Sequence, residues 1–356
     1  MRLLKSIRYV TLALALIILG TLAIPFAPMN SAGGSMLAQD ACDYPSETLQ
    51  LMAPAAPGGG WDTTAREMQR VLEENIVDQS VEVFNVEGAG GTIGLAQLVT
   101  DNAGDPHTLM VMGMVMIGAI GTNQAEIGLE SVTPIAGLTA EFEVIVVPAD
   151  SEYQTLEDLM ADFIADPGAI SWAGGSAGGT DHILVGLVAQ AAGIDPTLIN
   201  YIPYSGGGEA LAAILGGQVS AGVSGLGEWQ DQIIAGELRA LAISGSAAGD
   251  DGTPVADDMA SSPVAGALVI PTLQEQGIDV ELANWRGVVG PPDLTDEQRD
   301  CAAAMMQAMH DSGEWQAVME SYGWQDFFMA GADFADFLPG ETDRINGILL
   351  SLGLIE

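Results

Sequence analysis

The chain has 356 residues, and its 48 aspartates and glutamates against nine lysines and arginines give it a net charge of −39 at pH 7. A surface this acidic repels nucleic acids and anionic membranes, so we expect no nucleic-acid partner. Its hydrophobic content of 48% argues against intrinsic disorder, and its length favours two domains over one small core.

The N-terminus has the pattern of an export signal. Residues 1–39 carry three cations and no acid, and an apolar run from Val10 to Ala27 precedes small and polar residues. We assign residues 1–44 to a signal peptide and a short linker, which places the protein outside the cytoplasmic membrane, in the periplasm or at the cell surface. A retained N-terminal membrane anchor and lipidation of Cys42 are the alternatives. From residue 40 onward six arginines, no lysine and 48 acids leave a net charge of −42.

Only two cysteines are present, Cys42 and Cys301. In an exported chain two cysteines can form a disulfide, and we predict that these two pair. The three histidines, His107, His182 and His310, lie far apart, and there is no CxxC motif. The sequence therefore predicts neither a histidine–cysteine metal site nor a cofactor.

Strand-like and helical patterns alternate along the chain. In the first part, strands are predicted at 48–55, 81–86, 107–113 and 142–149, and helices at 63–75 and 92–100. The methionine-rich segment 109–118 is interpreted as a buried strand and its exit. The next part has strand-like runs at 169–175, 199–204, 219–225 and 238–244, with helices at 181–192 and 209–215. Helices at 295–310, 314–321 and 334–352 close the chain. The alternation predicts an α/β fold with mostly parallel strands.

Two strand-like runs that end in proline, 142–151 and 284–293, flank the middle of the chain. They could be two crossings between domains. Lobe one would then comprise residues 45–145 plus 288–356 and lobe two residues 146–287, with a ligand cleft between them. Two independent, consecutive domains are the alternative.

Four glycine-rich segments, 57–62, 88–94, 174–182 and 205–210, each lie between a strand pattern and a helix pattern. In open α/β sheets ligands bind at such turns. Unpaired amides at a helix start can hold an anion, and this chain would need them because it lacks lysine beyond residue 5. Each of these glycine-rich segments, taken alone, could equally be a tight structural turn.

Several side chains in or near these glycine-rich segments have two interpretations. Asp62 could order the first loop or pair with Arg66 at the i, i+4 spacing. Trp61 and Tyr204 could wall a pocket or fill the core. Arg286 could clamp a carboxylate or pair with a protein acid. Ser176 lies in a GxSxG match at 174–178, which leaves a secreted serine hydrolase as an alternative that needs a histidine such as His182.

The chain resembles the exported substrate-binding receptors of tripartite tricarboxylate transporters over residues 48–350. The resemblance is carried by strings that include PGGGWDTTAR, NVEGAGGTIG, GGSAGGTDH, YIPYSGGGEALAAILGGQVSAG and NWRGVVGPP. It implies a two-lobed periplasmic-binding-protein fold of type II that closes on a small tricarboxylate or dicarboxylate, without catalysis. Two integral membrane subunits of the transporter are the implied partners. Trp61 and the lysine-free body depart from the common pattern and leave the ligand's identity open.

We combine the residues carried over from this resemblance with the candidates found above. The predicted ligand-binding set is Pro57, Gly58, Gly59, Gly60, Trp61, Asp62, Thr63, Gly90, Gly91, Ser176, Gly178, Gly179, Thr180, His182, Tyr204, Ser205, Gly206 and Arg286.

Overall fold

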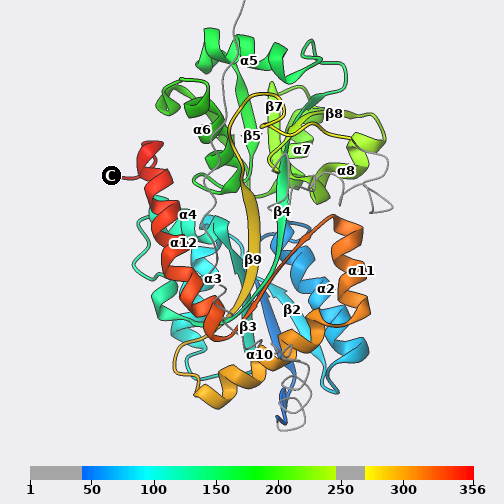
Figure 1. Ribbon diagram of the computed structural model, residues 1–356. Coiled ribbons are helices and arrows are strands. Elements are labelled where there is room, and N and C mark those ends of the chain that lie inside the picture. The colour runs from blue at the N-terminus through cyan, green and yellow to red at the C-terminus, as the bar shows by residue number, and fades with distance from the viewer. Residues whose placement is uncertain (1–41, 246–268) are drawn as a thin grey trace, which may run out of the picture.

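A computed structural model describes residues 42–245 and 269–356 (Figure 1). The predicted signal peptide, its cleavage and its alternative role as an anchor fall on residues 1–41, outside the described part. Within the described residues no helix is long and apolar enough to cross a membrane.

The strands form a continuous sheet in the order β2-β1-β3-β9-β4-β7-β5-β6, with β10 and β8 also paired to β4. One half contains β1 (Leu49–Ala53), β2 (Val81–Asn85), β3 (Thr108–Gly113), β9 (Ala283–Gly290) and β10 (Gln325–Ala330). The other contains β5 (Ser171–Gly174), β6 (Asn200–Pro203), β7 (Ala221–Gly225) and β8 (Leu238–Ile243). The strand β4 (Thr133–Pro148) belongs to both.

The expectation of mostly parallel strands is wrong for the centre of the sheet. The pairs β1–β2, β1–β3, β5–β6 and β5–β7 are parallel, but every pairing of β4 and β9 is antiparallel. The physical reason is that β4 and β9 carry the chain in opposite directions between the two halves, so they cannot run parallel to each other.

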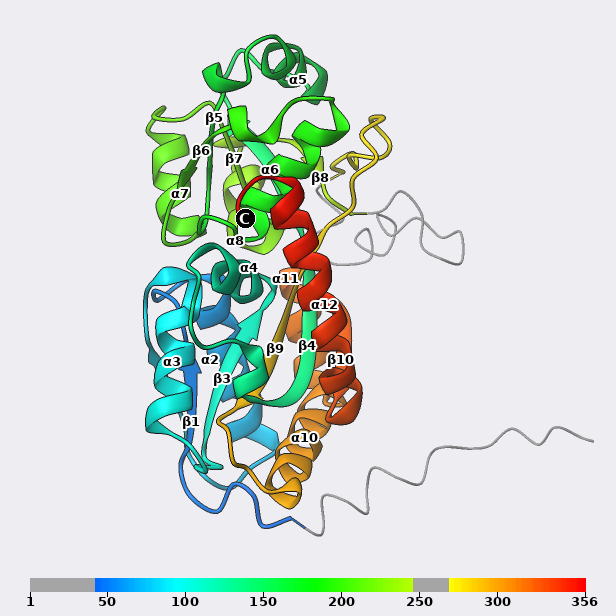
Figure 2. The same ribbon diagram turned by 90° about the vertical axis from the view of Figure 1, so that its left-hand side faces the viewer.

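The long strand β4 exchanges partners midway. Residues 133–142 pair with β9, and residues 143–148 pair with β7 and β8. The strand β9 begins at Ala283, opposite Phe142, and pairs with β3, so the chain returns to the first half instead of forming a separate following unit. Figure 2 shows the two resulting lobes one above the other, joined by β4 and β9.

Helices cover both lobes. The first lobe carries α2 (Gly60–Asn75), α3 (Thr92–Asp101), α4 (Met114–Thr122), α10 (Asp296–His310) and α11 (Gly313–Tyr322). The second carries α5 (Leu156–Ala165), α6 (Thr180–Ala191), α7 (Gly207–Leu215) and α8 (Leu226–Ile234). The last helix, α12 (Ala332–Ser351), runs along the first lobe and reaches the second, where Gln190 of α6 donates from Nε2 to the carbonyl of Ser351 at 3.0 Å (Figure 2).

Burial explains why these segments form these elements. All six residues of β3 are buried, as expected for a strand covered on both faces. The helix α2 buries Ala65, Met68, Val71 and Leu72, which recur at helical spacing on one face, and turns its charged residues outward. The turns at the ends of these rigid elements therefore have fixed positions.

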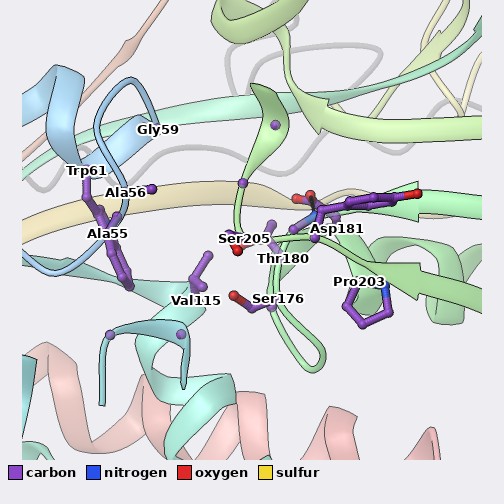
Figure 3. Close-up of a pocket in the computed structure, with 18 of the residues that line it drawn as sticks. Ala55, Ala56, Gly59, Trp61, Val115, Ser176, Thr180, Asp181, Pro203 and Ser205 are labelled. Atoms are coloured by element: carbon purple, nitrogen blue, oxygen red, sulfur yellow. Dashed lines mark hydrogen bonds between the residues drawn. The ribbon is translucent and has the colours of Figure 1, made fainter. Parts of the chain in front are cut away.

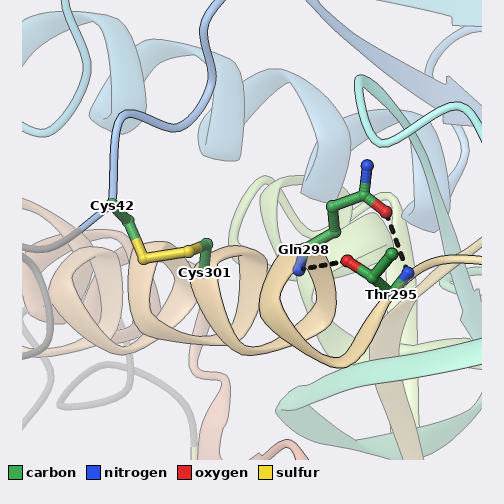
Figure 4. Close-up of a disulfide and its surroundings, with 4 residues drawn as sticks. All are labelled: Cys42, Thr295, Gln298 and Cys301. Carbon is green, nitrogen blue, oxygen red and sulfur yellow. Dashed lines mark hydrogen bonds between the residues drawn. A yellow bond between two sulfur atoms is a disulfide. The ribbon is translucent and has the colours of Figure 1, made fainter.

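A disulfide joins Cys42 to Cys301 across 259 residues of sequence, with a Cα–Cα distance of 5.7 Å (Figure 4). Cys301 lies on α10, which begins with a capping box. Gln298 N–H donates to Thr295 Oγ1 at 3.2 Å and Thr295 N–H to Gln298 Oε1 at 2.8 Å. The bond therefore fastens the start of the described chain to a well-capped helix.

Replacing both cysteines with serine is expected to lower the free energy of unfolding by about 2–4 kcal/mol, because the unfolded chain regains the freedom that the cross-link removed. Urea unfolding of both proteins would measure the difference. Reductant should shift the wild-type midpoint and leave the double variant unchanged. Equal midpoints for oxidised wild type and double variant would contradict a stabilising role.

Candidate functional site

A cavity of about 470 Å³ opens between the two lobes (Figure 3). The turns after β1 and β2 line it from the first lobe, and the turns after β5, β6 and β7 line it from the second. Asn284 and Arg286 of β9 complete the wall. All four glycine-rich segments predicted from the sequence contribute residues, so this cavity is the candidate site.

Five helices begin at this cavity with a glycine in the N-cap position and no side-chain cap. These N-caps are Gly59 of α2, Gly91 of α3, Gly179 of α6, Gly206 of α7 and Gly225 of α8, and all five line the cavity. The first turn of a helix has unpaired N–H groups and a partial positive charge. Several helix N-termini, which attract anions, therefore meet at the cavity.

In the first lobe, Asp62 orders the loop before α2 and lies outside the cavity lining. Its Oδ2 accepts hydrogen bonds from Gly58 N–H at 2.8 Å and from Arg66 Nε at 2.9 Å, and its Oδ1 accepts from Asn85 Nδ2 at 2.8 Å. Burial opposes ionisation, but these hydrogen bonds outweigh it and lower the pKa of Asp62. Both interpretations of Asp62, as loop organiser and as partner of Arg66, describe contacts that exist.

In the second lobe, His182 orders the loop before α6. Its Nδ1 accepts from Gly178 N–H at 3.1 Å, and its ring stacks on Tyr201 with centroids 4.1 Å apart. Burial lowers the pKa of His182 to about 4, so the ring is neutral at physiological pH. Thr180, at the start of α6, faces the cavity, and its buried Oγ1 has no hydrogen-bond partner within the described residues.

The cavity brings together most of the predicted set. It is lined by Gly59, Gly60, Trp61, Gly90, Gly91, Ser176, Gly179, Thr180, Tyr204, Ser205, Gly206 and Arg286. The lining does not include Pro57, Gly58, Asp62, Thr63, Gly178 or His182. Gly58, Asp62, Gly178 and His182 instead shape the two loops through the hydrogen bonds given above.

Arg286 has an internal partner. Its Nη2 forms a buried ion pair with Glu141 Oε1 of β4, and both side chains are 3% exposed. Trp324 Nε1 donates to the other oxygen of Glu141 at 3.2 Å, and the Arg286 guanidinium lies 5.3 Å from the centre of the Trp324 ring. Arg286 therefore follows the ion-pair interpretation while it still lines the cavity.

The family model described as "Tripartite tricarboxylate transporter family receptor" matches residues 64–354. The chain belongs to this family. It is 29% identical over 318 residues to Protein BugT of Bordetella pertussis, an alignment that covers 87% of this chain and 90% of BugT.

Two solved structures share the fold of this chain. The R. palustris protein Rpa4515 with adipate has a TM-score of 0.75 at 21% identity and covers 87% of this chain and 99% of its own. MatC from Rhodopseudomonas palustris with bound malate has a TM-score of 0.70 at 22% identity and covers 86% of this chain and 100% of its own. The periplasmic binding protein BugD has the same fold, with a TM-score of 0.75 at 20% identity, and covers 88% of this chain and 99% of its own, so the two-lobed periplasmic-binding-protein fold is established.

Four buried or half-buried acids near the cavity were not predicted from the sequence. They are Glu141 and Glu143 of β4, Asp181 of α6 and Glu228 of α8. Desolvation by burial, followed by the charges of the neighbouring acids, raises the pKa of Glu143 well above its ordinary value and that of Glu228 to about 8. Burial also raises the pKa of Asp181 to about 6. The available signal was two glutamates at alternate positions inside the apolar run of β4.

These shifts predict that the ligand-free protein loses stability as pH rises. The folded state holds a proton on Glu228 up to about pH 8, whereas the unfolded state releases it near the ordinary value of 4.5. The stabilisation that comes from the proton on Glu228 is therefore complete below about pH 4.5 and decreases as the pH rises to about 8. Asp181 contributes in the same direction up to about pH 6.

Urea unfolding should give a free energy lower by on the order of 3 kcal/mol at about pH 8 than at about pH 5. Glu228→Gln should flatten this dependence, and Glu237→Gln on the exposed turn after α8 should keep it. A free energy of unfolding that rises with pH in wild type would contradict the assignment.

The serine hydrolase alternative lacks its base. Ser176 lines the cavity, but no histidine ring in residues 42–245 and 269–356 hydrogen-bonds to its hydroxyl. His182 bonds to the Gly178 amide, His107 to Ser46, and His310 to Asp311 and Asp326. The GxSxG match is therefore explained by the glycine-rich turn in which it lies.

Proposed function

We propose that this receptor captures a small organic carboxylate, of the tricarboxylate or dicarboxylate class, outside the cytoplasmic membrane and delivers it to the membrane subunits of a tripartite tricarboxylate-type transporter. The observation that carries the proposal is the convergence of five helix starts with glycine N-caps on one cavity. The N–H groups of the first helical turns and the positive helix ends attract a carboxylate without a lysine.

The size of the cavity and the relatives support the same ligand class. A volume of about 470 Å³ suits a small molecule. Two structures with the same fold hold adipate and malate, which are both dicarboxylates. Membership in the transporter receptor family supports the membrane subunits as partners.

Capture would proceed by closure of the lobes, which we propose to be residues 45–145 plus 288–356 and residues 146–287. A ligand that contacts both lobes favours the closed state by its differential affinity. The strands β4 and β9, which connect the lobes, are the natural hinges. Thr180 and Ser176 would bind from the second lobe while Gly59 to Trp61 bind from the first.

A thermal-shift screen in high salt tests the proposal. The panel contains citrate, other tricarboxylates and dicarboxylates, aromatic acids, and the neutral amide of each acid as its matched control. A true ligand raises the melting temperature by mass action, and we expect at least one acid to do so while its amide does not. A flat result over the whole panel, with circular dichroism showing folded protein, would contradict the proposed ligand class.

A further inference from the structure

The cavity is acidic, although carboxylates are the proposed ligands. Four acids line it: Glu87, Asp181, Glu209 and Glu228. Arg286 is the single cation in the described lining, and Glu141 neutralises it. The helix starts can hold one carboxylate, but a purely anionic ligand would place its remaining charge near several protein acids. Like charges at close range disfavour such a complex.

Of these acids, Glu228 is the one expected to repel an anionic ligand most strongly. It projects from α8 of the second lobe across the cavity to the first. A Cβ added to Gly60 of α2 would lie 3.2 Å from Glu228 Oε1, and one added to Gly207 of α7 would overlap Oε2. The carboxyl group therefore lies against two helix starts and beside Arg286, in the wall of the cavity where the two lobes meet.

A second, independent observation points to a ligand in the same cavity. Thr180 is 1% exposed, lines the cavity, and has an Oγ1 with no hydrogen-bond partner within the described residues. An unpaired buried hydroxyl costs about 1–3 kcal/mol, which a bound ligand would recover. Figure 3 shows Thr180, Ser176 and Asp181 among the residues that surround the cavity.

We propose that the ligand is amphoteric, with a carboxylate held at the helix starts beside Thr180 and an ammonium group held by the acidic side of the cavity at Glu228. This inference rests on the proposed function and narrows its substrate class from organic acids to acids that carry an amine. An ammonium group has three donors and a full charge, so it matches carboxylate oxygens that a second ligand carboxylate would repel. A bare metal ion fits less well, because the described residues contain no cluster of three or more metal ligands.

The ionisation of Glu228 makes the inference measurable. Burial, Glu141 and Asp181 raise the pKa of Glu228 to about 8, while Arg286 and the Gly207 amide act in the opposite direction. Glu143 of β4 is a further acid that interacts with it. A bound ammonium favours the ionised form, so binding should release a proton below about pH 8 and strengthen as pH rises.

The test is isothermal titration calorimetry with pairs of acids that differ in the amine: malate and aspartate, 2-hydroxyglutarate and glutamate, adipate and 2-aminoadipate, benzoate and 4-(aminomethyl)benzoate. We expect the amine member of one pair to bind at least about ten-fold more tightly at about pH 8.5, with a smaller preference at about pH 6. Buffers with different ionisation enthalpies should reveal proton release for that member alone. This last measurement uses the wild-type protein and needs no variant.

Glu228→Gln should reduce the preference for the acid that carries the amine by about ten-fold or more. The affinity for the amine-free acid of the same pair should stay unchanged or rise. Glu237→Gln, with the same chemical change at an exposed position, should behave as wild type. If the amine-free acid binds as tightly as the acid with the amine, and Glu228→Gln leaves both affinities unchanged, the inference is overturned while the proposed function stands. If no acid of either kind binds to the folded protein, the proposed function fails, and this inference fails with it.

Discussion

Arg286→Met is expected to lower the free energy of unfolding by about 3–5 kcal/mol, the usual cost of leaving a buried charge without its partner. The variant keeps an unbranched side chain of similar length, so little packing is lost. Glu141, whose side chain is 3% exposed, would retain Trp324 Nε1 as a donor but lose its counter-charge. Other acids lie nearby and add repulsion. Urea unfolding followed by tryptophan fluorescence measures the effect.

Two further variants separate the ion pair from a general arginine effect. Arg299→Met removes an arginine that pairs with Asp296 and Asp300 on the more exposed surface of α10, and should change stability by less than about 1 kcal/mol. Combining Arg286→Met with Glu141→Gln should restore much of the loss, because no unpaired charge then remains. Equal destabilisation by Arg286→Met and Arg299→Met would show that the buried pair has no special role.

Gly118→Ala is expected to weaken ligand binding by about 100-fold or more. Gly118 lies on α4 of the first lobe, and a Cβ at this position would overlap the carbonyl oxygen of Gly178 in the second lobe. The obstacle is a backbone atom, so no rotamer change relieves the overlap. The lobes would have to stay apart, and the ligand would lose the contacts of one lobe. A loss of about 3 kcal/mol in binding corresponds to roughly 100-fold in affinity.

The same substitution should leave the fold intact, because alanine favours a helix over glycine by about 1 kcal/mol. Gly208→Ala on α7 is the matched control, since a Cβ there would meet nothing within 4 Å. Calorimetry gives the affinities, and small-angle scattering shows whether ligand still compacts the protein. Wild-type affinity and compaction in Gly118→Ala would mean that this contact does not accompany closure.

The positions of the helix starts were predictable from the sequence because glycine-rich turns are local features. Gly59, Gly91, Gly179 and Gly206 all lay in segments recognised between a strand pattern and a helix pattern, and the structure places them at one cavity. The alternation of patterns likewise predicted the α/β class. These features depend on neighbours in sequence, which a pattern can report.

The features that were not predicted depend on distant partners. Glu141 and Glu143 lie in an apolar run, but only the pairing of β4 with β9 and β7 and its packing against α8 remove them from water. The antiparallel direction of β9 likewise depends on where the chain returns. The interpretation of 109–118 as a strand and its exit was correct to Gly113, but α4 begins at Met114, because a uniformly apolar run has no period that distinguishes helix from strand.

The most direct test of the central claim is the affinity of Thr180→Val for the acid that raises the melting temperature most. Valine keeps the shape of threonine and removes a buried hydroxyl of the cavity lining that has no partner within residues 42–245 and 269–356. Calorimetry should show affinity lower by about 10- to 100-fold, which corresponds to about 1.5–3 kcal/mol for a hydrogen bond to a charged group. Thr100→Val, on the exposed side of α3, should bind as wild type. An unchanged affinity in Thr180→Val would contradict the claim that a carboxylate is held at these helix starts.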